Sequence, residues 1–79
     1  MTTADATTQA IRMVPGHTVI CNERYQSTHH GDVRTEGLDC QISVHPALEG
    51  SALCQQFRGS SFETCLHHLT TTIAALTAP

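Results

Sequence analysis

The sequence predicts an α+β fold, with a three- or four-stranded antiparallel sheet followed by one C-terminal amphipathic helix packed on one face. Residues 37–45 alternate between apolar and polar side chains, which is typical of a strand with one buried face. Residues 62–76 repeat apolar side chains at helical spacing, after the capping-box pair Ser60 and Glu63. The inward-facing positions are Leu38, Cys40, Ile42 and Val44 in the strand and Phe62, Cys65, Leu66, Leu69, Ile73 and Leu76 in the helix.

The first residues of the chain carry no clear pattern. Residues 1–9 are rich in threonine and alanine, and we interpret them as a flexible tail before a single domain over residues 10–79. Residues 11–14 form either a short first strand or a lead-in to the next strand. The Pro15-Gly16 pair that follows predicts a turn.

The middle of the chain predicts two further strands around turns. Residues 17–27 are expected to form a strand, and residues 28–36 contain a turn with Gly31-Asp32 at its tip, whose flanks extend both strands into a long hairpin. After a turn over residues 46–50, residues 52–58 form the next strand, with Leu53 and Phe57 facing inward.

The charge balance disfavours a nucleic-acid-binding protein. The 79 residues have a net charge of -3, with seven acids, four arginines and no lysine. Nucleic-acid affinity depends largely on neutralised phosphates, whereas an acidic protein suits a basic protein surface. The start has no signal-peptide pattern and no segment has the apolar length of a membrane span, so we expect a cytoplasmic protein with four free thiols.

The cysteines and histidines do not form a recognisable metal or catalytic motif. Successive cysteines are separated by 18, 13 and 10 residues, so the close ligand pairs of structural zinc sites are missing. We therefore expect no metal, no cofactor and no enzymatic activity. Whether Cys54, His29 and His30 bind a metal stays open, as does a metal- or redox-responsive role for the thiols.

An acidic cluster around the predicted hairpin is the main candidate site. Five of the seven acids fall between Glu23 and Glu49. One interpretation is a solvated hairpin that resists edge aggregation; the other is a surface that docks on a basic groove of a protein partner. The candidate partner-binding residues are Glu23, Asp32, Glu36, Asp39 and Gln41.

The outer face of the predicted helix is uncharged after Glu63. A solvated helix face usually carries acids and bases, so this face suggests a homodimer in which the same helix of a second copy covers it. The alternative explanation is a composition bias in a genome that uses little lysine.

Residues 46–76 resemble the HicB-type antitoxins, whose N-terminal domain is a partial RNase-H-like sheet with a helix. The turn Pro46-Ala-Leu48-Glu-Gly50 is similar to their Pro-x-Leu-x-Gly turn. The segment Gly59-Ser-Ser61-Phe-Glu63 is similar to the Gly-x-Ser/Thr-x-Glu start of their helix. The resemblance implies this fold and a small toxin as the partner.

The chain also resembles, by type only, the small phage-encoded inhibitors such as anti-CRISPR proteins, which block a nucleic-acid-guided complex. This resemblance implies a non-catalytic inhibitor that occupies the basic face of an effector complex. We therefore expect an inhibitor of this kind, with a HicB-like antitoxin and a metal- or redox-responsive module as alternatives.

Overall fold

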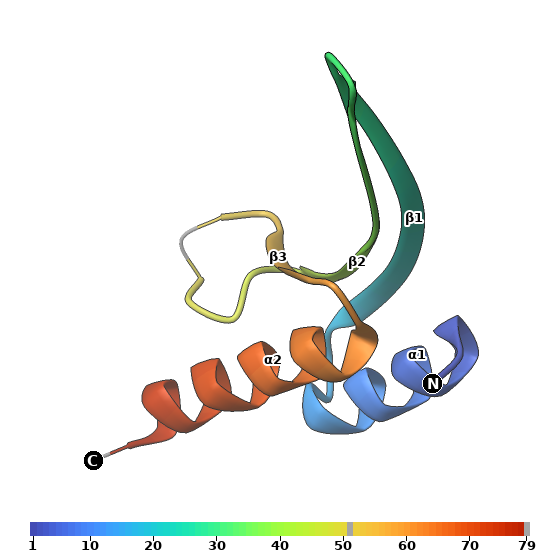
Figure 1. Cartoon of the computed structure of the whole chain (residues 1–79). Helices are drawn as coiled ribbons and strands as arrows, with labels where there is room; N and C mark the ends of the chain where they lie inside the picture. Colours follow the sequence, from blue (N-terminus) through green and yellow to red (C-terminus); the bar gives the residue numbers. More distant parts are fainter. Residues whose placement is uncertain (51, 79) are drawn as a thin grey trace.

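The computed structural model describes residues 1–50 and 52–78. The three strands form one antiparallel sheet in the order β1-β2-β3, and both helices lie against the same face of it (Figure 1). The predicted α+β class, with an antiparallel sheet and a C-terminal helix packed on it, is thus confirmed. The elements are α1 (Thr3–Met13), β1 (Thr18–His30), β2 (Val33–His45), β3 (Gln55–Gly59) and α2 (Phe62–Thr77).

Helix α1 occupies the segment that the sequence suggested to be a tail and a short strand. A capping box begins the helix: Thr2 Oγ1 accepts the Asp5 N–H at 3.1 Å, and the Thr2 N–H donates to Asp5 Oδ2 at 3.2 Å. Ala6 and Ala10 are fully buried, and they form a narrow stripe that packs on the sheet. Alanine is a strong helix former but a weak hydrophobic signal, so the sequence pattern hid this helix.

Strands β1 and β2 form the predicted long hairpin. Their register is continuous from the pair Thr18 and His45 to the pair His30 and Val33. Gly31 has φ 61° and occupies the first central position of the two-residue turn, a position where hairpins of this kind favour glycine. The tip predicted at Gly31-Asp32 is therefore confirmed, and both strands extend to it.

Strand β3 is shorter than predicted, at Gln55–Gly59 instead of 52–58. The prediction that Leu53 faces inward is wrong, because Leu53 lies in the loop before the strand and is 89% exposed, whereas Phe57 is buried as expected.

Helix α2 begins one residue later than the predicted capping box, because Ser61 is the N-cap and accepts the Thr64 N–H at 3.2 Å. No helix in the described part of the chain is long and apolar enough to span a bilayer.

The core lies between the sheet and the two helices. Besides Leu53, the predicted inward positions Leu38 and Leu76 lie outside it, at 42% and 48% exposed, and Ile73 is partly buried and packs against it. Leu38 belongs to a part of β2 that no helix covers. Leu76 lies in the last turn of α2, which extends beyond the strands (Figure 1). The buried cluster comprises Ala6, Ala10, Val14, Cys40, Ile42, Val44, Phe57, Phe62, Cys65, Leu66 and Leu69.

Candidate functional site

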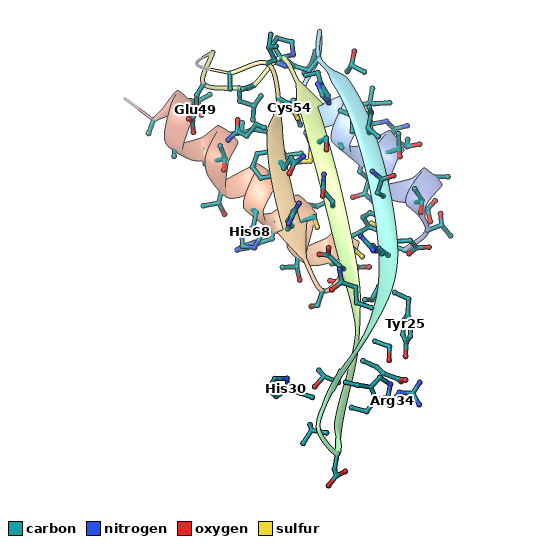
Figure 2. All side chains as sticks on the ribbon, turned by 90° about the horizontal axis from the view of Figure 1, so that it is seen from above. Tyr25, His30, Arg34, Glu49, Cys54 and His68 are labelled. Atoms are coloured by element: carbon teal, nitrogen blue, oxygen red, sulfur yellow. The ribbon has the colours of Figure 1, made fainter. Side chains whose placement is uncertain are left out.

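The hairpin of β1 and β2 continues well beyond the rest of the sheet. β3 pairs only with Cys40–Val44 of β2, so residues 24–39 form a two-stranded ribbon, which we call the arm. The molecule measures 50 × 24 × 21 Å, and its radius of gyration is 14.4 Å. A compact chain of this length would have a radius of gyration of about 12 Å. The arm accounts for the difference, and both figures show that it extends beyond the helices (Figures 1 and 2).

One face of the arm carries an ordered group around Tyr25. The Tyr25 hydroxyl donates to Glu36 Oε2 at 2.6 Å, and Glu36 also forms an ion pair with Arg34. Arg34 Nε in turn donates to Ser27 Oγ at 3.4 Å. The hydrogen bond to Glu36 raises the pKa of Tyr25, because ionising the phenol beside the carboxylate is unfavourable. The ring is held in place although 64% of Tyr25 is exposed.

The other face of the arm is polar and continues onto the sheet. Arg24 on β1 lies opposite Asp39 on β2, and Gln41 lies between Asn22 and Arg58 in the next row. These residues and Gln26 line a shallow hollow of about 460 Å³, at which Glu23 also contributes to the wall. Ser43 follows Gln41 on this face of β2 but is only 6% exposed, and Gln41 Nε2 donates to its hydroxyl at 3.0 Å.

The structure does not bring the five predicted partner-binding residues onto one surface. Glu23 and Glu36 belong to the face of the hairpin that faces the helices, as the strand alternation requires. Asp39 and Gln41 belong to the opposite face, and Asp32 lies at the tip. Charge spacing along the chain could not show this division, because it depends on the register of two strands.

Tyr25 is the feature of the arm that the sequence analysis missed. It is the only tyrosine of the chain, and alternation places it opposite Leu38, which is also exposed. The signal was available in principle, since an aromatic residue and a leucine facing each other across a predicted hairpin form an apolar pair. The alternation of residues 37–45 instead predicted Leu38 to lie in the core.

The sulfur and imidazole groups are dispersed over the molecule. Cys54 lies at the opposite end of the molecule from His30 (Figure 2), so Cys54, His29 and His30 do not form a metal site. Within residues 1–50 and 52–78, no group of three His, Cys, Asp or Glu side chains is placed to hold a metal ion.

Cys40 and Cys65 are buried beneath the sheet, and Cys65 Sγ donates to the Cys40 carbonyl at 3.3 Å. Burial raises the pKa of both thiols, which makes them poor nucleophiles and poor redox sensors.

The buried thiol of Cys65 predicts alkaline sensitivity. Burial raises its pKa from 9.0 to about 11, so the unfolded chain loses this proton first as the pH rises. Stability is therefore retained below about pH 9 and falls between pH 9 and 11, by on the order of 2 kcal/mol at the upper limit. Urea unfolding at pH 7 to 11 measures the loss. Cys65→Ala should flatten the profile, whereas Cys54→Ala should keep it; a fall of equal size in both variants would contradict the assignment.

The chain was also compared with known proteins. No protein-family model, curated protein or solved structure matches it.

Proposed function

We propose that this chain is a non-catalytic inhibitor that binds a nucleic-acid-handling protein complex through the arm, in the manner of the phage-encoded anti-CRISPR proteins. The single observation that carries the proposal is the arm itself. Every described side chain of residues 24–38 is exposed, so the arm presents two faces and a tip to a partner.

Tyr25 has the properties of a binding anchor. Tyrosine is enriched among the residues that contribute most to protein interfaces. Its hydrogen bond to Glu36, together with the ion pair between Glu36 and Arg34, holds the ring in one position before any partner arrives. A preordered side chain loses less conformational entropy on binding than a mobile one, which favours affinity.

The acids of the arm suit a basic groove. Asp32 lies at the tip, and neither Asp32 nor Asp39 forms an ion pair within the described residues. A groove that binds nucleic acid is lined by basic side chains that attract phosphates, and carboxylates are attracted by the same field. An arm seated in such a groove would exclude the nucleic acid.

A HicB-like antitoxin is the second candidate. The segment that resembles those proteins folds as a turn, the strand β3 and the helix α2, which is the order that the resemblance implies. α1 and the long arm are additions to that plan. The partner would then be a small toxin instead of an effector complex.

The first experiment is an affinity purification of the tagged full-length chain from its host, with mass spectrometry of the bound proteins. Recovery of a nucleic-acid-handling complex supports the inhibitor, and recovery of a small toxin supports the antitoxin. The purified partner is then titrated against variants of the arm, with binding of the partner to its nucleic acid as a second readout.

The arm variants are expected to distinguish the contribution of the Tyr25 side chain to binding from that of the negative charge at Asp32. Tyr25→Ala should weaken binding about 30-fold, the loss expected for a central aromatic anchor. Asp32→Arg should weaken binding mainly through slower association, and added salt should reduce this effect.

Glu49→Arg reverses an exposed acid in the loop before β3 and is the matched control, expected to change affinity less than twofold. Equal affinity of all three variants would exclude the arm as the binding surface.

A further inference from the structure

The outer edge of β1 is a long strand edge without a partner. Within residues 1–50 and 52–78, β1 pairs with β2 alone, so the backbone N–H and C=O groups on the other side of this 13-residue strand have no partner strand. Figure 2 shows β1 as one border of the sheet, with β3 as the other. An open edge of this kind is a template for pairing with another strand.

Strand β1 also lacks the usual devices that protect an edge. It contains no proline and no lysine, and its register with β2 is continuous, without a bulge. Its two charged residues, Glu23 and Arg24, are adjacent and of opposite sign. The edge is therefore chemically suited to strand pairing over nearly its whole length.

We infer that β1 pairs antiparallel with β1 of a second copy of this chain, across a two-fold axis at Tyr25. A two-fold interface is self-complementary, so each residue meets its counterpart mirrored about the axis residue. An axis at Tyr25 places residues 20–30 of one copy opposite residues 30–20 of the other, a ladder roughly 35 Å long.

The charges of β1 exclude two nearby positions of the axis, at Glu23 and at Arg24. An axis at Glu23 would place Glu23 opposite Glu23 of the second copy, and an axis at Arg24 would place two arginines opposite each other; like charges in this position are destabilising. With the axis at Tyr25, Arg24 faces the neutral Gln26 and Glu23 faces the neutral Ser27. An axis closer to His30 shortens the ladder, and one closer to Thr18 brings the two helix layers together.

The shape of the molecule also favours this arrangement. Tyr25 lies where the arm leaves the helices (Figure 2), so the two bodies would lie at opposite ends of the ladder, each beside the other copy's arm tip. A two-stranded ribbon alone has marginal stability, and pairing turns the two arms into four strands. The Tyr25 side chains of both copies would stand side by side on the same face, so the proposed anchor becomes a pair.

The test is the mass of the full-length chain in solution, measured by sedimentation equilibrium without any partner protein. The wild type should sediment as a dimer, at twice the 8.5 kDa of one chain. Gln26→Arg places an arginine opposite Arg24 on both sides of the axis and should weaken dimerisation at least tenfold. Gln26→Glu places a carboxylate there instead and should strengthen it. The double variant Arg24→Glu with Gln26→Arg restores opposite charges and should recover the dimer.

A wild type that stays monomeric at 100 µM would overturn the inference. Equal dimerisation of Gln26→Arg and Gln26→Glu would overturn it too, and would favour the uncharged outer face of α2 as the dimer contact. Circular dichroism of each variant confirms that it is folded. Because no target protein is present, these outcomes are independent of the proposed inhibitory function.

Discussion

Replacement of Leu69 by alanine is expected to lower the free energy of unfolding by about 3 to 5 kcal/mol. Leu69 is fully buried between α2 and the sheet, among the largest buried side chains of the core. Its truncation removes apolar contacts and leaves a cavity, because packed surroundings relax only in part. A domain of this size has a total stability of only about 3 to 5 kcal/mol. The variant should therefore be largely unfolded at 25 °C, as measured by circular dichroism and urea unfolding.

Leu53→Ala is the matched control for this loss. It makes the same chemical change at a leucine in the loop before β3 that is almost fully exposed. Surface substitutions of this kind usually change stability by less than about 0.5 kcal/mol. Similar urea midpoints for the two variants would contradict the assignment of the core.

Replacement of Ala10 by aspartate is expected to unfold the chain as well. Ala10 is fully buried in the contact between α1 and the rest of the core. An aspartate there would bury a carboxylate without a partner, at a cost of several kcal/mol. Far-UV circular dichroism and urea unfolding at pH 7 measure the effect. The result distinguishes a docked helix from the flexible tail that the sequence suggested, because a tail would tolerate the substitution.

Ala4→Asp is the control for the helix itself. Ala4 is exposed in the first turn of α1, where a negative charge interacts favourably with the helix dipole. This variant should be as stable as the wild type or more stable by a few tenths of a kcal/mol. If both aspartate variants have the same urea midpoint as the wild type, α1 contributes nothing to the core.

The sequence by itself determined the parts of the fold that depend on local pattern. The alternation of Cys40, Ile42 and Val44 identified the inner face of β2, and all three are buried. Gly31-Asp32 located the hairpin tip, and the capping box and helical spacing located α2 to within about one residue at each end. These features depend on turn preferences and side-chain periodicity within about ten residues, so the local sequence is enough to predict them.

The tertiary structure alone decided which apolar residues are covered. Leu38 continues the alternation of β2, but neither helix reaches this part of the strand, so nothing covers Leu38. α1 shows the reverse case: Ala6 has almost no hydrophobic signal of its own and is buried because sheet and helix meet there. The arm follows from the short pairing of β3 with the long strand β2, and the open edge of β1 follows from the strand order β1-β2-β3. Periodicity assigns a side chain to a face, but burial requires a second element long enough to reach it.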